Sequence, residues 1–373
     1  MHIWNSPAWP HFRHDPAKTE RPLARVMARL GSIDGLHAGL SAAERQEIFL
    51  RAVTGEALAS FAIEGVRLPA PEIEASVIAS LTHRQTVPQR RSDAIAELML
   101  DARTPGARAP DTRVPEASPA DSQAPFDIPT LHRWHALLFH GMEVEDPGRW
   151  RSFPIDIVRG PSGQPRDVLY SAPPPERVPQ EMQRFLGWLA RDTHPLPVRA
   201  ALAHLWFESI HPFADGNGRI GRAIVERIFA TEGALPFSLS RQIEADKRGY
   251  YAALQTGRRD AGAYIDATGF VLWFLDRLDA GITEAAAQAR FLVRRNAYLT
   301  AHADLPPRPL AVLRRLFDQG QIRVEQGLSA GPYAKMAKVS AATATRDLTM
   351  MESAGALLRS TSGGRSTRYL LTW

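Results

Sequence analysis

The twelve residues from His211 to Arg222 constrain the fold more than any other part of the chain. Apolar residues recur at helical spacing on both sides of them: Leu202, Leu205 and Trp206 before, and Ile220, Ile224 and Ile228 after. The sequence between, Pro-Phe-Ala-Asp-Gly-Asn-Gly, is too rich in glycine and short polar residues to continue either pattern. The chain is therefore expected to form a tight loop between two core helices, and this loop ends at a helix N-terminus.

This loop carries residue types that suit a ligand rich in phosphate. Gly216 and Gly218 let backbone N–H groups approach a ligand without a Cβ in the way. The start of the next helix adds free donors and partial positive charge. Arg219 and Arg222 are three residues apart, so they share one helix face and can both reach an anion.

Two further side chains add chemistry at the same place. Asp215 can hold Mg²⁺ through one carboxylate, with phosphates and water as the other ligands, and His211 can accept a proton near neutral pH. Phe213 is expected to anchor the loop in the core. Taken singly, these features are typical of a turn, a structural histidine or a solvated arginine face, but together they favour a polyphosphate site. A zinc site of His204, His211 and Asp215 lacks the usual spacing of its two histidines.

The rest of the chain predicts a mainly α-helical protein. Ser41 and Glu44 have capping-box spacing and start a helix that should end near Gly65. Further helices are expected at about 71–83, 91–102, 129–140, 178–191, 197–209, 217–232, 241–256, 264–280 and 284–300. Residues 103–125 are rich in proline, alanine, aspartate and serine, which predicts a linker or irregular loop. Two short β-like runs within 153–170 predict a small β-hairpin.

A proline cluster at 306–309 predicts a domain boundary. Helices expected at about 309–318, 332–338 and 341–353, with two β-like runs around 361–364, follow the order of a winged helix-turn-helix domain. Residues 306–373 carry ten Lys or Arg and four Asp or Glu, whereas the rest of the chain carries 35 and 36. This excess makes 332–368 a candidate DNA contact, with Arg346 in the expected recognition helix, although winged helices serve equally for protein contacts.

Composition excludes several classes of protein. The 373 residues include no cysteine, which removes disulfide scaffolds, thiolate metal sites and thiol nucleophiles. The first residues lack the pattern of a signal peptide, and no apolar run approaches the ~18 residues that a membrane helix needs. We therefore expect a cytoplasmic protein without membrane contact.

The stretch from His211 to Arg222 resembles the signature loop of Fic-domain proteins, His-x-Phe-x-(Asp/Glu)-Gly-Asn-Gly-Arg-x-x-Arg, at every fixed position. The hairpin with Tyr170, followed by prolines, resembles the Fic flap, and the beginning of the chain is similar to a short module that precedes Fic domains in one bacterial subfamily. The resemblance implies four parts: a helical N-terminal module at 1–102, the linker at 103–125, a Fic catalytic domain at 126–305 and the winged helix at 306–373.

Fic proteins mostly transfer AMP from ATP to a hydroxyl of a target protein, and the resemblance implies this activity here. His211 would deprotonate the Ser, Thr or Tyr hydroxyl, and Asp215 would hold Mg²⁺ on the α and β phosphates. The target would add a strand to the flap. The nucleotide-binding residues that the resemblance implies are Gly216, Asn217, Gly218, Arg219, Ile220, Gly221, Arg222, Tyr250 and Tyr251, with the tyrosines at the adenine. Some relatives have an asparagine seven positions after the second tyrosine, where this chain has Arg258.

A second motif, from Ser60 to Gly65, resembles the inhibitory helix signature of the same family, (Ser/Thr)-x-x-x-Glu-(Gly/Asn). The resemblance implies that Glu64 pairs with Arg222 and takes the charge that should bind the γ phosphate of ATP. The protein would then restrain its own activity until Glu64 moves. In some relatives this glutamate also supports removal of AMP from the target. By the same resemblance, we also expect a homodimer that stabilises the inhibitory helix.

Two other functions stay open from the sequence alone. A nucleotide-sensing transcriptional regulator would use the Fic core as its sensor and the C-terminal segment on DNA. A transferase of phosphocholine or phosphate would keep the fold and change the donor, although the two arginines of the motif favour a triphosphate.

Overall fold

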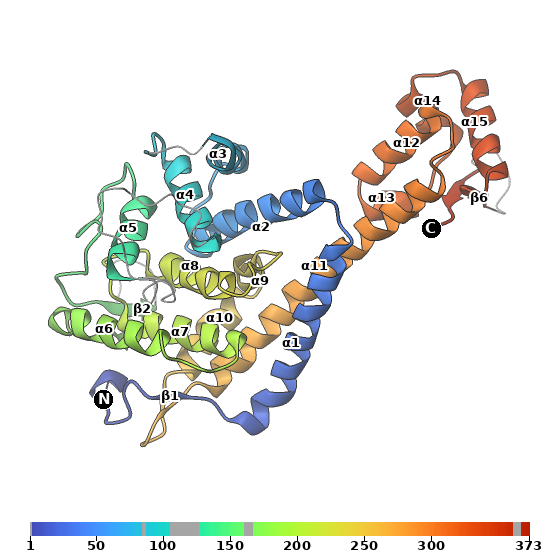
Figure 1. Cartoon of the computed structure of the whole chain (residues 1–373). Coiled ribbons are helices and arrows are strands. Elements are labelled where there is room, and N and C mark those ends of the chain that lie inside the picture. The colour runs from blue at the N-terminus through green and yellow to red at the C-terminus, as the bar shows by residue number, and fades with distance from the viewer. Residues whose placement is uncertain (1, 84–86, 105–126, 160–166, 361–366) are drawn as a thin grey trace. The chain divides into compact units, whose positions relative to one another are not determined.

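The computed structural model describes residues 2–83, 87–104, 127–159, 167–360 and 367–373 (Figure 1). The chain divides into two compact units, one made of residues 1–33 and 41–285 and the other of residues 34–40 and 286–373. Helices α1 (Pro16–Ala38) and α11 (Thr268–Ala301) each contribute residues to both units.

The first unit is built almost entirely of helices. Besides its parts of α1 and α11, these are α2 (Ala42–Ile63), α3 (Ala70–His83), α4 (Arg91–Arg103), α5 (Ile128–Leu138), α6 (Val178–Leu189), α7 (Leu196–Ile210), α8 (Asn217–Ala230), α9 (Leu239–Ala245) and α10 (Lys247–Thr256). Helix α7 is buried along nearly its whole length and lies beside α8, as Figure 1 shows. Helix α2 packs against α3, α4, α8 and α9. The core therefore surrounds α7 and α8, the two helices that flank the loop from His211 to Gly216.

Side-chain caps fix several of these helix starts. Ser41 accepts a hydrogen bond from the Glu44 backbone, and the Glu44 side chain accepts one from the Ser41 backbone, which is the predicted capping box. At the starts of α5 and α10, the side chains of Asp127 and Asp246 accept hydrogen bonds from the Thr130 and Gly249 backbones. Helix α2 ends with Glu64 as its C-cap residue, so the second sequence motif lies at the end of a long helix.

Short strands complete the first unit. The 3₁₀ turn η1 (Ile3–Asn5) precedes β1 (Phe12–Arg13), which pairs in parallel with β5 (Ile265–Asp266); β5 also pairs antiparallel with β4 (Arg259–Asp260). Strands β2 (Asp156–Arg159) and β3 (Asp167–Ser171) form the predicted antiparallel hairpin, with Ile157 opposite Tyr170. The turn of this hairpin, residues 160–166, lies outside the described residues. The 3₁₀ turn η3 (Pro175–Arg177) then leads into α6.

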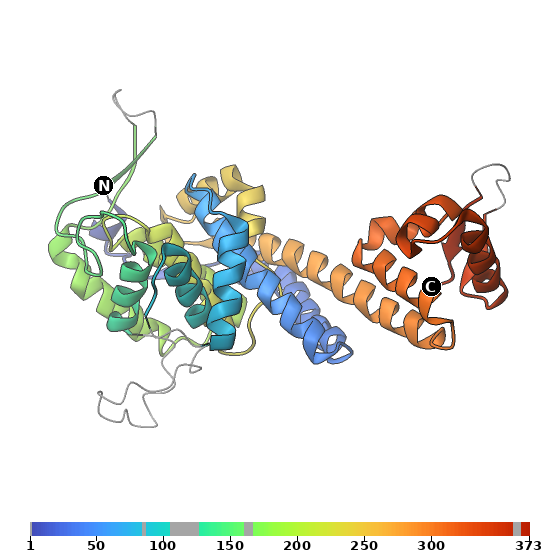
Figure 2. The ribbon, with the colours of Figure 1, turned by 90° about the horizontal axis from the view of Figure 1, so that it is seen from above.

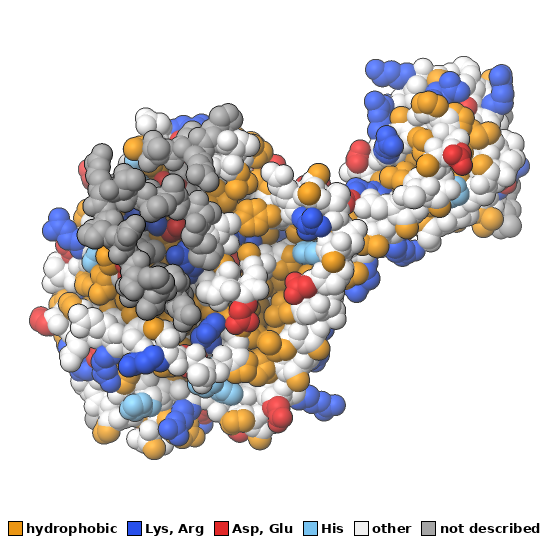
Figure 3. All heavy atoms as spheres, viewed as in Figure 1, with side chains coloured by type: hydrophobic (Ala, Val, Ile, Leu, Met, Phe, Trp, Pro, Cys, Tyr) orange, Lys and Arg blue, Asp and Glu red, His pale blue; other side chains and the backbone are white. Residues whose placement is uncertain are grey.

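The second unit has its own apolar core. It contains α12 (Pro307–Asp318), α13 (Gln321–Glu325), α14 (Ala330–Ala337), α15 (Ala341–Ser353) and the antiparallel strands β6 (Leu357–Arg359) and β7 (Tyr369–Leu371), drawn in red in Figure 2. Arg308 holds Asp347 through two hydrogen bonds of 2.8 Å, and Tyr333 donates a third of 2.8 Å. Lysine and arginine side chains mark the surface of this unit in Figure 3. Its assignment as a winged helix stays a prediction.

The mainly helical fold with a small hairpin is confirmed, but several elements differ from the expectation. The short helix α13 and the strands β1, β4 and β5 were not expected. Helix α1 was not expected, because its buried residues, Thr19, Val26 and Ile33, recur only every seventh position and form a narrow stripe. The helix expected at 241–256 is broken at Asp246, whose side chain caps α10. The two helices expected at 264–280 and 284–300 are one, because Gly281 lets Phe237 pack closely on α11 and does not end it.

The described helices were compared with the length and apolar character of a membrane-spanning helix. None of them combines the length and the apolar character that crossing a bilayer would require.

Candidate active site

The loop between α7 and α8 is held by two residues in left-handed backbone conformation. His211 caps the C-terminus of α7 with φ 51°, and Gly216 precedes α8 with φ 77°. A Cβ on Gly216 would lie 2.5 Å from Cδ2 of Leu138 and 3.0 Å from Cε2 of Phe139. Both the backbone angle and the space therefore require glycine at this position, and the loop starts α8 with free backbone donors.

Asn217 and Phe213 fix the loop from inside. The Asn217 amide accepts a hydrogen bond of 2.9 Å from the Phe213 backbone and donates one of 2.8 Å back to it. The Phe213 ring is fully buried and stacks on His135, with ring centroids 4.3 Å apart. The Asn217 side chain therefore shapes the loop, and what Asn217 can offer to an anion is its backbone N–H at the helix start.

Arg151 supports the loop from the side of the flap. Its side chain is 2% exposed and donates hydrogen bonds to the carbonyls of His211 (2.8 Å), Phe153 (2.8 Å) and Pro173 (2.6 Å). Its backbone N–H donates to the Pro212 carbonyl. One buried guanidinium thus ties the signature loop to both ends of the β2–β3 hairpin. Arg151 was not predicted as a site residue, because nothing in the local sequence pattern around it marks a buried arginine.

His211 lies near the surface with its imidazole mostly covered. Burial, together with the positive charge of Arg258, lowers the pKa of the imidazole to about 3, so the ring is neutral at physiological pH. Its Nδ1 lies 3.8 Å from Oε2 of Glu208 and has no hydrogen-bond partner among the described residues. Burial raises the pKa of the Glu208 carboxyl to about 7. A neutral imidazole with a carboxyl group beside it can accept a proton.

The two motif arginines lie on α8 in different surroundings. The guanidinium carbon of Arg219 lies 5.2 Å from the ring centroid of Phe61 and 5.1 Å from that of Phe139, and its Nη2 is 3.1 Å from Oδ2 of Asp215. Arg222 is buried and donates from Nε to the Ser60 hydroxyl (2.9 Å) and from Nη2 to the Ser60 carbonyl (2.8 Å). The two sequence motifs therefore meet in space.

Glu64 completes this meeting point. Its Oε1 accepts a hydrogen bond of 2.9 Å from Nη2 of Arg222, and the same oxygen would lie 2.5 Å from a Cβ placed on Gly218. Burial alone would lower the pKa of the Arg222 guanidinium, but the neighbouring Glu64 raises it above its usual value. A carboxylate thus lies against the glycine and arginine side of the α8 N-terminus, where an anion would otherwise bind.

The other predicted nucleotide residues differ in their exposure. Ile220 is fully buried, and a Cβ on Gly221 would lie 3.1 Å from the His204 ring, so both face the core. Tyr250 is also buried, and its hydroxyl lies 2.9 Å from Nε2 of His204. Tyr251 is 43% exposed, and burial of its hydroxyl with nearby Glu64 raises its pKa to about 12. Of the two tyrosines, only Tyr251 is open to a ligand from solution.

The donor set at Asp215 fits a metal that is bound mainly by a substrate. No group of three or more His, Cys, Asp or Glu side chains able to hold an ion occurs among the described residues. Asp215 instead offers one exposed carboxylate beside the α8 N-terminus. Mg²⁺ is commonly held by one or two carboxylates together with substrate phosphates and water. Asp215 therefore fits Mg²⁺ that arrives with a nucleotide, and such an ion would offset phosphate charge.

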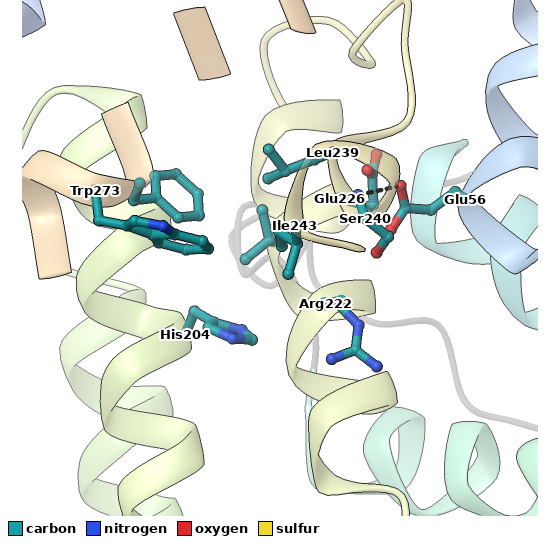
Figure 4. Close-up of a pocket in the computed structure, with 10 residues that line it drawn as sticks. Glu56, His204, Arg222, Glu226, Leu239, Ser240, Ile243 and Trp273 are labelled. Atoms are coloured by element: carbon teal, nitrogen blue, oxygen red, sulfur yellow. Dashed lines mark hydrogen bonds between the residues drawn. The ribbon is translucent and has the colours of Figure 1, made fainter. Parts of the chain in front are cut away.

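Buried polar groups hold the motif helices together behind the site. Figure 4 shows a small cavity that Arg222 and Glu226 of α8 share with Glu56 of α2 and Ser240 of α9. Glu56 accepts hydrogen bonds from the Ser238 hydroxyl (2.8 Å) and from the Ser240 backbone (3.0 Å). Glu226 pairs with the buried Arg103 of α4 at 2.9 Å. This network fixes α2, which carries Glu64, against the helices around Arg222.

The flap is connected to the end of α7. The Tyr170 hydroxyl donates a hydrogen bond of 2.7 Å to the Ser209 carbonyl, and Arg258 donates from Nε to the Ser209 hydroxyl at 2.9 Å. The Trp4 indole donates to the Ser171 carbonyl at 2.7 Å, so the start of the chain lies against β3. Glu208 and Arg258 lie close to His211 and were not predicted as site residues. The sequence showed only that Arg258 stands where some relatives have an asparagine.

Comparisons with known proteins agree with this geometry. Residues 125–229, which include the whole loop, match the Fic/DOC family, and residues 2–82 match a domain of unknown function, DUF4172. A uridine 5'-monophosphate transferase of Xanthomonas campestris is 30% identical over 126 residues, which are 31% of this chain and 23% of that protein. The protein adenylyltransferase Fic of Nematostella vectensis is 33% identical over 132 residues, 34% of this chain and 27% of that protein. The chain thus spans about a quarter of the length of these relatives.

A solved structure extends the likeness to most of the chain. A Fic family protein from Desulfovibrio desulfuricans has 24% sequence identity and a TM-score of 0.50, and the match covers 94% of this chain and 96% of that chain. At this identity the likeness shows the fold alone. Residues 125–229, which include the signature loop, thus match the Fic/DOC family, and most of the chain shares the fold of a Fic family protein.

Proposed function

We propose that this protein transfers AMP from ATP to a hydroxyl group of a Ser, Thr or Tyr residue, on a target protein and on itself, and that Glu64 restrains the transfer. The observation that carries the proposal is the position of the Glu64 carboxylate, on Arg222 and against Gly218. A carboxylate held there takes the place of a phosphate, since both are anions that a guanidinium and a helix N-terminus bind. The site is thus suited to a polyphosphate, and the Glu64 carboxylate occupies the place of one phosphate.

The chemistry follows from the residues around the loop. The neutral His211 imidazole takes the proton of the incoming hydroxyl, and the hydroxyl oxygen forms a bond to the α phosphorus of ATP. The bond from this phosphorus to the bridging oxygen of the β phosphate breaks, and pyrophosphate leaves. The backbone donors at the start of α8, with Arg219 and Arg222, hold the phosphates in line for the attack. Asp215 would hold Mg²⁺ on the phosphates.

The restraint acts on the position of the phosphates. While Glu64 accepts from Nη2 of Arg222, its carboxylate occupies part of the guanidinium and its charge repels the γ phosphate. The α phosphate would then be displaced from the line of attack. Movement of the end of α2 away from Arg222 would release the site. A glutamate at this place can also polarise a water molecule for attack on the AMP that is bound to the target. We therefore propose that the protein also removes AMP from the target.

The residues of the site say less about the base of the nucleotide than about its phosphates. Relatives carry the names adenylyltransferase and uridine 5'-monophosphate transferase, so a Fic core is compatible with either base. Tyr251 is the exposed aromatic ring of the predicted pair and is the residue that we assign to stacking on the base. Competition between ATP and UTP for the same site tests this assignment.

The decisive experiment measures intact mass after incubation with Mg²⁺ and ATP labelled at the α or the γ phosphate. The variants are the unaltered protein, Glu64→Gly, Glu64→Gly with His211→Ala, and Glu143→Gly, which changes an exposed loop glutamate as a control. We expect an AMP-sized gain with α label only, largest in Glu64→Gly, unchanged from the unaltered protein in Glu143→Gly and absent in the double variant. Retention of γ label would contradict adenylyl transfer and favour phosphate transfer.

The same experiment separates the alternatives. Failure of Glu64→Gly to modify itself or any peptide acceptor, together with tight ATP binding, would favour the nucleotide-sensing regulator. Such a regulator should bind DNA through residues 332–368, which gel retardation tests directly. The homodimer stays a prediction and is tested by the mass of the protein in solution.

A further inference from the structure

Arg258 is a buried arginine close to the candidate catalytic histidine, His211. It follows α10, is 9% exposed and donates one hydrogen bond, from Nε to the Ser209 hydroxyl at 2.9 Å. Its guanidinium carbon lies 4.3 Å from the ring centroid of Tyr170, which is the stacking distance of a cation on an aromatic face. Ser209 is two residues before His211 in the chain, and Tyr170 belongs to the flap, so Arg258 links the two.

The charge of Arg258 has no direct ion-pair partner among the described residues, although at longer range it partly offsets the raised pKa of the Glu208 carboxyl. Its Nη2 is buried and has no hydrogen-bond partner, and no carboxylate lies within ion-pair distance of it in the part of the chain that the structure describes. A buried guanidinium without a counter-ion is costly, because the lost hydration is not replaced. Other buried arginines of this site have direct partners: Arg222 pairs with Glu64, Arg103 pairs with Glu226, and Arg151 donates to backbone carbonyls. Arg258 is therefore a positively charged group that still needs an anion.

A pocket of about 410 Å³ opens next to this guanidinium. It is lined by Arg258 and Gln255, by residues 168–171 of the flap, and by His2 and Ile3. The loop from His211 to Arg222 contributes no residue to its lining. The pocket thus adjoins β3 of the flap, where a target strand is expected, and is separate from the loop that would hold the phosphates.

We propose that Arg258 binds the carboxylate of an aspartate or glutamate that flanks the modified hydroxyl in the target protein. This inference rests on the proposed transfer function and names its substrate class: an extended acidic segment added to the flap. Main-chain pairing with a flap strand selects for shape and not for sequence, so a charged pocket at the end of the strand supplies the missing selectivity. Gln255 and His2 also line this pocket and have side chains that can form hydrogen bonds.

A purely structural role of Arg258, as a support for Tyr170 and Ser209, makes different predictions. A support would affect every acceptor equally, whatever its charge. A carboxylate-binding residue affects only acceptors with an acid at the right position, and a reversed charge reverses the preference. The test therefore compares peptides that differ in one charge.

The probes are synthetic extended peptides with a single threonine acceptor in a neutral sequence. One series places Glu at each of the three positions on either side of the threonine, and matched series place Gln or Lys there. AMP transfer is measured in the Glu64→Gly protein, and peptide binding is measured by fluorescence anisotropy. We expect one or two Glu positions to raise kcat/KM about tenfold over the Gln twin, as charge-assisted hydrogen bonds do.

Arg258→Gln should reduce this ratio to about one, and Arg258→Glu should favour the Lys peptide. Arg259→Gln is the matched control, because Arg259 is the next residue but is exposed and pairs with Asp266. Arg258→Lys keeps the charge if the other variants fold poorly, and thermal melting reports folding of each variant. Equal use of Glu and Gln peptides by the protein with Arg258 intact, or a preference that survives Arg258→Gln, would overturn the inference.

The two proposals fail in different ways. Glu-dependent binding that requires Arg258 without any AMP transfer would support the acidic subsite and contradict the transferase. Transfer to Glu and Gln peptides at equal rates would support the transferase and overturn the subsite. Binding of no peptide to any variant would also overturn the subsite, because recognition of a carboxylate by this arginine is then absent.

Discussion

The Glu64 carboxylate and the Arg222 guanidinium meet at 2.9 Å, although 157 residues separate them in the sequence. The same Glu64 oxygen lies 2.5 Å from the position of a Cβ on Gly218. The end of α2 and the start of α8 are therefore fitted to each other so closely that glycine is needed between them. This contact links Gly218, which has no side chain, to the restraint that we propose.

A double-mutant cycle on Gly218 and Glu64 tests this fit. Gly218→Ala should lower the free energy of unfolding by about 1 kcal/mol while Glu64 is present, because the new Cβ displaces the carboxylate from Arg222. In the Glu64→Gly background the same change should be neutral or stabilising by about 0.5–1 kcal/mol, since alanine is the better helix former. Urea unfolding of the four proteins gives the coupling. Gly31→Ala, in an open part of α1, is the control and should be additive with Glu64→Gly.

Replacement of Arg151 should loosen the signature loop and the flap together. Arg151→Met leaves the His211, Phe153 and Pro173 carbonyls without their donor in a buried place. We expect a loss of about 3 kcal/mol in unfolding free energy, which corresponds to a fall in Tm of roughly 6–12 °C for a unit of this size.

Arg149→Gln is the control for this change, because Arg149 is exposed two residues away and should shift the stability by less than about 0.5 kcal/mol. A Tm of Arg151→Met within a degree of the control would show that the carbonyls find other partners.

The sequence predicted the helices around the site because their signals are local. The capping box at Ser41, the apolar periods before and after the loop, and the glycines of the loop all act within a few residues. Helix α1 escaped prediction because only a narrow stripe of it is buried. Long-range polar contacts escaped for a different reason: whether an arginine is buried, as Arg151 and Arg258 are, depends on segments far away in the chain.

Within the candidate site, the motif pattern predicted which residues meet but not how each one contributes. The sequence grouped Asn217, Ile220 and Gly221 with the nucleotide-binding residues, whereas the side chains of Asn217 and Ile220 serve the loop and the core. Of the two tyrosines, burial distinguishes Tyr250 from Tyr251, and adjacent positions on a helix do not reveal which side faces the core.

Acidification should destabilise the protein in part through His204. Burial lowers the pKa of this imidazole from 6.5 to about 3. Between these two values the unfolded chain binds a proton that the folded protein does not, so the free energy of unfolding falls as the pH drops below about 6.5. This single group should contribute a slope of about 1.4 kcal/mol per pH unit between pH 6 and pH 4.

His204→Gln removes this contribution, so its stability should fall less steeply than that of the unaltered protein over the same pH range. His135 and His211 also have lowered pKa values, so part of the slope remains in the variant. His140→Gln changes a histidine outside this core and should keep the full slope. Parallel pH profiles for all three proteins would contradict the assignment of a neutral buried His204.

Glu208 should act on the reaction through His211. Its Oε2 lies 3.8 Å from Nδ1 of His211, and burial raises the pKa of the carboxyl to about 7. The charged form, present above this pKa, stabilises the imidazolium that forms when His211 takes the hydroxyl proton. Transfer by the Glu64→Gly protein should therefore rise with pH through a midpoint near or below 7, because loss of the Glu64 charge lowers the pKa of Glu208 somewhat.

Glu208→Gln in the same background should lower kcat by about 10- to 100-fold and leave the KM for ATP unchanged, since a carboxylate that acts through His211 is not expected to bind the phosphates. The variant should also lose the rise in rate near pH 7, because an amide does not titrate. Glu232→Gln, at an exposed position just after α8, should keep both the rate and the profile. A Glu208→Gln protein with normal kcat but a weaker KM would instead place Glu208 in substrate binding, and an unchanged pH profile would assign the titrating group to the nucleotide.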